Sequence, residues 1–199
     1  MKKLILLLVL VLTVSNSLNA FSYNSEPKIF IEELVADAVS ILEDKSISKI
    51  DQENAIKKIA LENVDIKGLG MYMLGNARKN LDASTLETYH DLFKEYFLKL
   101  LTSKLTDYSS KDFEILGAEQ KSASYTIVKS KIGESAGKPA IKINWRVYTK
   151  NPTKPLIRDL IAEGLSMARV QREEFASILN SNNNDINALF STFKEFIKR

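Results

Sequence analysis

Ile141–Tyr148 has the sequence IKINWRVY, in which apolar and polar residues alternate along most of its length. Successive side chains of a β-strand point to opposite faces, so this pattern predicts a strand with one dry and one wet face. The dry face consists of Ile141, Ile143, Trp145 and Val147. Turn residues separate three further strand-like runs, Phe113–Gly117, Ser122–Ile132 and Leu156–Ala162. We therefore expect about four strands, paired antiparallel.

Helical periodicity flanks this strand region on both sides. Two helices are predicted after it, at about Ser166–Leu179 and from Asp185 onward. Before it, four helices are predicted at about Pro27–Leu42, Asp51–Val64, Asp65–Leu74 and Ser84–Leu101. Ser84 and Glu87 have capping-box spacing, and Gly75 suits a helix end. Helices, then a strand meander, then helices indicate an α+β fold.

The first 20 residues have the pattern of a secretory signal peptide. Lys2 and Lys3 precede an apolar run from Leu4 to Val14, and a polar stretch ends at the small residue Ala20. This run is shorter than the roughly 20 residues that span a bilayer. We therefore expect cleavage near Ala20, export to the periplasm, and a soluble single domain over residues 21–199.

Composition excludes several functional classes. The chain has no cysteine and one histidine, so disulfides, cysteine zinc sites and multi-histidine metal sites are excluded. Without Lys2 and Lys3 the 28 basic residues become 26 against 25 acidic ones, a net charge of about +1. A nucleic-acid-binding protein would show a strong basic excess, so no nucleic-acid partner is expected.

No residue pattern indicates catalysis, and no cofactor or metal site is expected. His90 could act as a base, but an ordinary position on its helix is favoured. Asp159 and Glu163 could form a carboxylate pair, although capping or an ion pair with an arginine is favoured there. The apolar faces of the predicted helices and strands, including Phe93 and Phe97, are the remaining feature that could indicate a function. Periodicity alone does not distinguish a filled core from a ligand cavity.

Arg158–Met167, with the sequence RDLIAEGLSM, resembles the signature of the MlaC family, also called toluene-tolerance auxiliary proteins. An aspartate on the last strand precedes a Glu-Gly-x-Ser turn and a helix. Arg172 and Phe175 are similar to the family's Arg-x-x-Phe continuation. Leu74-Gly75, the aromatic-rich segment 92–97 and Asn144–Arg146 extend the resemblance in order over essentially the whole mature chain.

The resemblance implies an NTF2-like curved antiparallel sheet, packed with helices around an apolar pocket. It implies a periplasmic phospholipid carrier and no enzyme. The implied partners are a phospholipid, an outer-membrane lipoprotein–porin complex and an inner-membrane Mla ABC transporter with a ring-forming substrate-binding subunit. Shuttling between them would maintain outer-membrane lipid asymmetry. The alternatives are a binder of another apolar ligand, an enzyme on the same scaffold, and an adaptor with a filled core.

Two sets of residues are candidates for this function. The pocket wall is expected to comprise Phe93, Phe97, Tyr125, Ile127, Ile141, Ile143, Trp145 and Val147. The signature turn is expected to comprise Asp159, Glu163, Gly164 and Ser166. The favoured role of this turn is structural, with Gly164 adopting an unusual backbone path and Ser166 capping the next helix. The alternative is that it sets the geometry of a lid through which lipid enters.

The N-terminal pattern yields the first prediction. Protein expressed with its natural start should be recovered from the periplasm with a mature N-terminus near Phe21, because a signal peptidase removes the preceding segment. Intact-mass measurement and N-terminal sequencing of the periplasmic fraction check this. Recovery only in membranes, or with Met1 retained, would contradict it.

Overall fold

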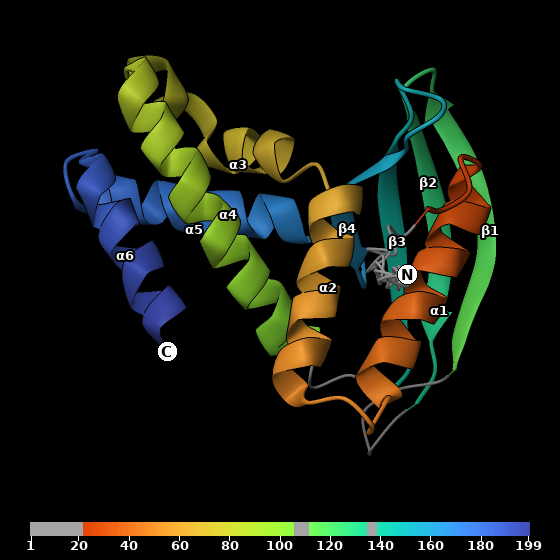
Figure 1. Cartoon of the computed structure of the whole chain (residues 1–199). Helices are drawn as coiled ribbons and strands as arrows, with labels where there is room; N and C mark the ends of the chain where they lie inside the picture. Colours follow the sequence, from red (N-terminus) through yellow and green to blue (C-terminus); the bar gives the residue numbers. More distant parts are fainter. Residues whose placement is uncertain (1–21, 106–111, 135–138) are drawn as a thin grey trace, which may run out of the picture.

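Helices occupy both ends of the described chain, and one antiparallel sheet lies between them in sequence (Figure 1). The structure is a computed structural model that describes residues 22–105, 112–134 and 139–199, and the predicted signal peptide, residues 1–20, lies outside these ranges. The helices described are α1 (Pro27–Glu43), α2 (Lys49–Asn63), α3 (Ile66–Leu74), η1 (a 3-10 helix, Gly75–Asn80), α4 (Ala83–Leu105), α5 (Met167–Ser181) and α6 (Ile186–Lys198). The strands are β1 (Phe113–Ser122), β2 (Tyr125–Ile132), β3 (Ile141–Tyr148), β4 (Leu156–Ala162) and β5 (Leu165–Ser166). The predicted α+β class is confirmed.

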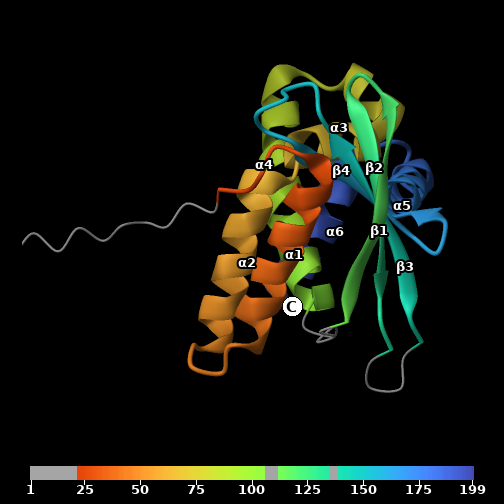
Figure 2. The ribbon, with the colours of Figure 1, turned by 90° about the vertical axis from the view of Figure 1, so that its right-hand side faces the viewer.

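The strands pair in chain order, each antiparallel to the next, and form an open meander. Strands β1–β4 correspond to the four predicted runs, and β5 adds two residues that are too few to show a period in sequence. Helices α1 and α2 lie side by side along one face of the sheet, which we call the inner face (Figure 2). The opposite face is the outer face.

The register of β2 corrects one sequence prediction. Val128 pairs with Trp145, whereas Ile127 pairs with Arg146 and Tyr125 with Tyr148. Directly opposed residues share a face, so Tyr125 and Ile127 lie on the outer face and do not share the surface of Trp145. Adjacent Ile127 and Val128 leave the phase of the alternation ambiguous, and a one-residue change of phase exchanges the two faces.

The hydrophobic core forms two clusters rather than one. The helical cluster joins α3–α6, and its largest fully buried side chains are Tyr89, Phe93, Phe175 and Phe193. The sheet cluster lies between α1 and the inner face, and it contains Phe30, Ile31, Val128, Val147 and Ile157. Each cluster is densely buried, with several side chains that are no more than 1% exposed. The fold therefore has a boundary between two packed regions.

Local sequence sets most helix limits as predicted. Pro27 lies in the first turn of α1, and Gly75 ends α3 with a φ of +61°, a conformation that favours glycine. Helix α4 begins within one residue of its predicted start, but the predicted capping residue is wrong: Asp82 rather than Ser84 provides the cap, because its Oδ1 accepts the Thr85 N–H at 2.7 Å. No helix in the described ranges combines the length and apolarity needed to cross a membrane.

The turn between β4 and β5 has the unusual backbone predicted for it. Glu163 and Gly164 have φ values of +48° and +85°, the positive pair that a type I′ hairpin turn requires. The Glu163 backbone N–H donates to the Lys142 carbonyl at 3.0 Å, and its side chain accepts the Lys142 N–H at 2.5 Å. These bonds secure the turn against the neighbouring strand, β3.

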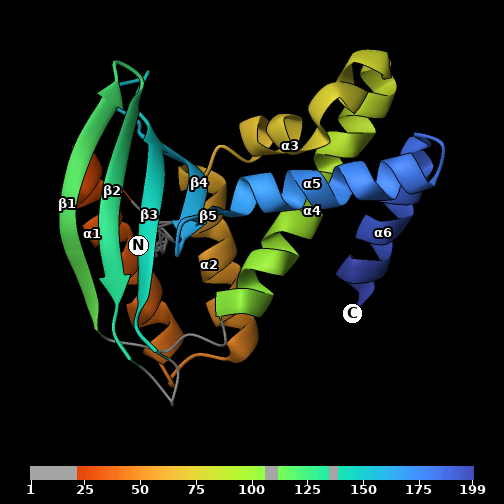
Figure 3. The same ribbon diagram turned by 180° about the vertical axis from the view of Figure 1, so that it is seen from behind.

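Asp159 connects this turn to α5. Its Oδ2 accepts the Ser166 hydroxyl at 2.6 Å, and its Oδ1 accepts the Ala168 N–H at 3.0 Å. Ser166 caps α5 by accepting the Arg169 N–H at 3.1 Å, as predicted. Figure 3 shows α5 leaving the β4–β5 edge and running away from the sheet toward α6. A buried carboxylate therefore fixes where the sheet ends and the helical half begins.

Gly164 yields the second prediction. Gly164→Val should lower the free energy of unfolding by about 1–2 kcal/mol, because an L-residue side chain disfavours the left-handed region. A Cβ atom added at Gly164 would meet no other atom within 4 Å, so the loss should come from the backbone alone. Gly164→Asn is the matched control, since asparagine tolerates this region, and urea unfolding followed by circular dichroism measures both. Equal losses for the two variants would contradict the backbone explanation.

Candidate functional site

An apolar cavity lies where the two hydrophobic clusters meet, and its volume is about 200 Å³. One side of its lining belongs to the sheet cluster and includes Leu34, Ile59 and Ile157. The other side belongs to the helical cluster and includes Leu69, Met73 and Ala168. The cavity is therefore the place where packing between the two halves of the fold is incomplete.

Four of the predicted pocket residues divide between the cavity and the solid clusters. Phe97 from α4 and Trp145 from β3 line the cavity. Phe93 and Val147 are 1% and 0% exposed, and each is packed inside a cluster rather than along the cavity. Phe93 instead contacts the rings of Phe175 and Phe193, with centroids 6.3 and 6.2 Å away.

Ile141 and Ile143 share the inner face with Trp145, but they lie outside the cavity lining. Both are half-buried near the start of β3, opposite Ile132 and Ser130 of β2. Tyr125 and Ile127 point from the outer face, as the register requires. Of the eight predicted wall residues, Phe97 and Trp145 line this cavity and the other six do not, with Tyr125 and Ile127 on the opposite face of the sheet.

The predicted wall also omitted the helices α1 and α2, which supply much of the real lining. Leu34 and Ala38 of α1, and Ile56 and Ile59 of α2, line the cavity together with Leu160 of β4. Helical periodicity placed the α1 and α2 residues on apolar faces. It did not show what those faces meet, because that depends on how the elements pack.

Trp145 enters this apolar wall without leaving an unpaired polar group. Its indole N–H donates to the Ser130 hydroxyl at 2.8 Å, and that hydroxyl donates to the Ile143 carbonyl at 3.0 Å. Ser130 is 1% exposed, so both bonds are sheltered from water. A buried indole N–H without a partner would be costly, and Ser130 removes that cost.

A β-bulge on β4 separates the apolar cavity from a polar cluster on the outer face. Val147 pairs with Ile157, but the next pair joins Arg146 to Asp159, which leaves Arg158 as the extra residue. Ile157, the inward-facing residue before the bulge, lines the cavity, and so does Leu160 after the bulge. Asp159 instead pairs on the outer face, which is why it reaches α5.

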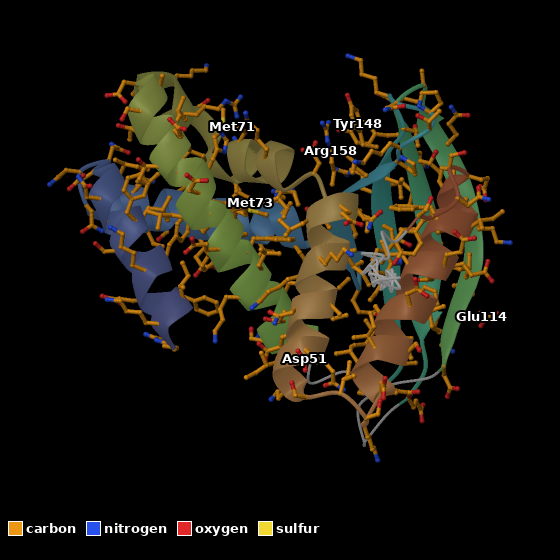
Figure 4. All side chains as sticks on the ribbon, viewed as in Figure 1. Asp51, Met71, Met73, Glu114, Tyr148 and Arg158 are labelled. Carbon is orange, nitrogen blue, oxygen red and sulfur yellow. The ribbon has the colours of Figure 1, made fainter. Side chains whose placement is uncertain are left out.

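Arg158 is held on several sides at this bulge. Its Nε donates to Asp65 Oδ2 at 2.5 Å, its Nη1 donates to the Tyr125 hydroxyl at 2.8 Å, and its guanidinium carbon lies 3.4 Å from the Tyr148 ring centroid. Figure 4 shows Arg158 and Tyr148 close together on the side of the sheet that faces α3. Burial alone would lower the pKa of Arg158, but the bonds to Tyr125 and Asp65 outweigh it and raise that pKa.

His90 lies apart from the apolar cavity. It borders a larger cleft of about 810 Å³, together with Lys67, Glu87 and Asp91. Its Nδ1 is buried and has no hydrogen-bond partner in the described part of the chain. Burial, followed by the positive charge of Lys67, lowers the pKa of His90 below its ordinary value of 6.5. Among the described residues, no group of three or more metal-ligating side chains is placed to hold an ion.

An antiparallel sheet packed with helices around an apolar cavity defines a class of α+β proteins that can enclose a ligand. The sequence model of the MlaC protein family matches residues 32–195, and the chain therefore belongs to the MlaC family. A solved structure of similar fold is a phospholipid-binding protein from Ralstonia solanacearum in complex with a phospholipid. The two are 14% identical with a TM-score of 0.69, and the match covers 84% of this chain and 94% of that chain.

The environment of His90 yields the third prediction. Proton NMR titration of its ring should give a midpoint below 6.5, because burial and Lys67 favour the neutral form. Folding then gains stability from this group above pH 6.5, and that gain is lost as pH falls through the lowered folded-state pKa. His90→Gln should remove this part of the pH dependence. A midpoint at or above 6.5 would contradict the assignment.

Proposed function

We propose that this protein binds a phospholipid with its acyl chains in the apolar cavity and carries it through the periplasm. The cavity at the boundary of the two clusters is the observation that carries the proposal, because it offers an apolar environment inside a protein with no membrane-spanning helix in its described ranges. Membership of the MlaC family and the fold shared with a phospholipid-binding protein support the choice of ligand. The domain involved is residues 21–199.

Burial of acyl chains supplies the energetic reason for a carrier. Removing a methylene group from water is worth about 0.8 kcal/mol, so about 30 methylenes amount to of order 20 kcal/mol. A lipid therefore crosses water very slowly without protection. A pocket as apolar as a bilayer makes the transfer from membrane to protein nearly neutral in free energy, and the direction of transport then depends on the partners.

The cavity must widen to receive two acyl chains. Its volume of about 200 Å³ is below the roughly 300–1,000 Å³ that ligand pockets usually have. The wall is made by two separately packed clusters, so it can open along their boundary while each cluster keeps its own contacts. Loading by separation of α1 and α2 from α3 and α5 follows from this arrangement.

The proposed protein partners are inferred from membership of the MlaC family. On this proposal the protein accepts lipid from an outer-membrane lipoprotein–porin complex and delivers it to the ring-forming subunit of an inner-membrane ABC transporter. The result would be maintenance of outer-membrane lipid asymmetry. No catalytic step is needed, because exchange of a lipid between two apolar environments breaks no covalent bond.

Blocking the cavity yields the fourth prediction. Protein purified from cells should carry phospholipid in native mass spectrometry, and Ala38→Phe should lose it, because Ala38 lines the cavity and a phenyl ring would occupy much of the space. Ala36→Phe is the matched control on the exposed side of the same helix, and it should keep its lipid. Normal lipid in a folded Ala38→Phe variant would contradict the assignment of the cavity.

The same experiment separates the competing functions. A different apolar ligand would indicate another binding protein on this scaffold, and no ligand would favour an adaptor with a filled core. Trp145, the only tryptophan, gives a second readout because it lines the cavity. Phospholipid with brominated acyl chains should quench its fluorescence in the wild type and in Ala36→Phe, but not in Ala38→Phe.

A further inference from the structure

A polar cleft adjoins the apolar cavity on the outer face of the sheet. Its volume is about 230 Å³, and it lies between β2–β4, the first turns of α3 and the start of α5. Leu69, Asp159 and Ala168 line both the cleft and the cavity. The two spaces therefore lie on either side of one wall, made by β4 on the sheet side and by α3 and α5 on the helical side. One ligand with an apolar part and a polar part occupies both only when this wall parts, as in the opening proposed above for loading.

The cleft has an excess of cationic hydrogen-bond donors. Arg146 and Arg158 line it. Arg172 is not part of the lining, but its guanidinium carbon lies 5.0 Å from the ring centroid of the lining residue Tyr72. Asp65 and Asp159 are the carboxylates that contribute to its wall or bind its arginines. Three guanidinium groups against two carboxylates leave a net positive charge.

Both carboxylates are already engaged by the fold. Asp65 Oδ1 caps α3 by accepting the Gly68 N–H at 2.9 Å, while its Oδ2 binds Arg158. Asp159 has a side chain that is only 2% exposed, and its two oxygens accept hydrogen bonds from Ser166 and Ala168. Neither carboxylate is therefore free to form a close ion pair with Arg146, the second arginine of the lining.

Arg146 and Tyr125 keep donors available to a ligand. The nearest carboxylate oxygen to Arg146 Nη1 is Asp159 Oδ2 at 3.9 Å, which is beyond hydrogen-bond distance, and the Arg146 side chain is 45% exposed. The Tyr125 hydroxyl accepts from Arg158, so its own proton can be donated into the cleft. Arg158 is held in place by Asp65 and Tyr148, so it presents its guanidinium without further ordering.

We propose that this cleft binds the phosphate group of the lipid whose acyl chains occupy the adjoining cavity. Guanidinium groups bind phosphate through paired, charge-assisted hydrogen bonds, and the half-exposed position keeps the phosphate partly hydrated. A phosphate buried without partners would be very unfavourable, so a polar cleft beside an apolar cavity suits a two-part ligand. This inference rests on the proposed function and adds the position of the head group.

Arg158 also has a structural role, and this determines which residues of the cleft are suitable for substitution. Arg158 joins α3 to the sheet through Asp65, so replacing it would disturb the fold as well as the cleft. Arg146→Gln and Tyr125→Phe are cleaner, because one removes a half-exposed charge and the other a single hydroxyl. Arg169→Gln is the matched control: Arg169 lies on α5, is 73% exposed and pairs with Glu173 outside the cleft.

The test compares two lipids with identical acyl chains. Delipidated mature protein is incubated with vesicles that contain dioleoylphosphatidylglycerol or dioleoylglycerol, and uptake is measured by native mass spectrometry after separation from the vesicles. Wild type and Arg169→Gln should take up the phosphate-bearing lipid in preference. The double variant Arg146→Gln/Tyr125→Phe should take up about tenfold less dioleoylphosphatidylglycerol than the wild type, as expected for the loss of one charge-assisted hydrogen bond. Its uptake of dioleoylglycerol should equal that of the wild type.

The outcomes separate this inference from the proposed function. Uptake of neither lipid by the wild type would overturn both. Uptake of both lipids without preference, or equal loss of both in the double variant, would overturn the phosphate site alone. Inorganic phosphate, titrated calorimetrically into delipidated wild type, distinguishes the source of the anion: submillimolar binding would assign the cleft to a free anion, and its absence supports a lipid head group.

Discussion

Asp159 holds the sheet and the helical half of this protein together. Its carboxylate is almost fully buried, and it accepts hydrogen bonds from Ser166 and from the first turn of α5. Helix α5 then carries Phe175 into the helical cluster. Loss of one buried acceptor would therefore leave two donors unpaired and free the direction of α5, which is why the rest of the architecture depends on this contact.

The β-bulge at Arg158 places that carboxylate where it is needed. Without the extra residue, strict alternation would turn the Asp159 side chain to the inner face, which it would share with Ile157. With it, Asp159 pairs with Arg146 on the outer face and forms part of the wall between cavity and cleft, while Ile157 and Leu160 line the cavity. One inserted residue thus divides a dry space from a wet one, and the two-part ligand that we propose would need both.

On the proposed function, two packed clusters suit lipid loading better than one continuous core would. A single core would have to lose contacts throughout to admit acyl chains, whereas a boundary can open while each side remains folded. The aromatic rings of the helical cluster and the α1–sheet packing supply that separate stability. The cavity is therefore a consequence of how the core is divided.

The α+β class, the strand Ile141–Tyr148, the cap at Ser166 and the turn at Gly164 could all be predicted from the sequence, because each depends on local periodicity or backbone chemistry. The sequence also carried the family signature. Which apolar faces surround a cavity was decided by the tertiary structure. It moved Tyr125 and Ile127 to the outer face, buried Phe93 and Val147 in solid clusters, and paired Arg158 with Asp65. These outcomes depend on strand register and on contacts between residues far apart in the chain, and local patterns contain no information about either.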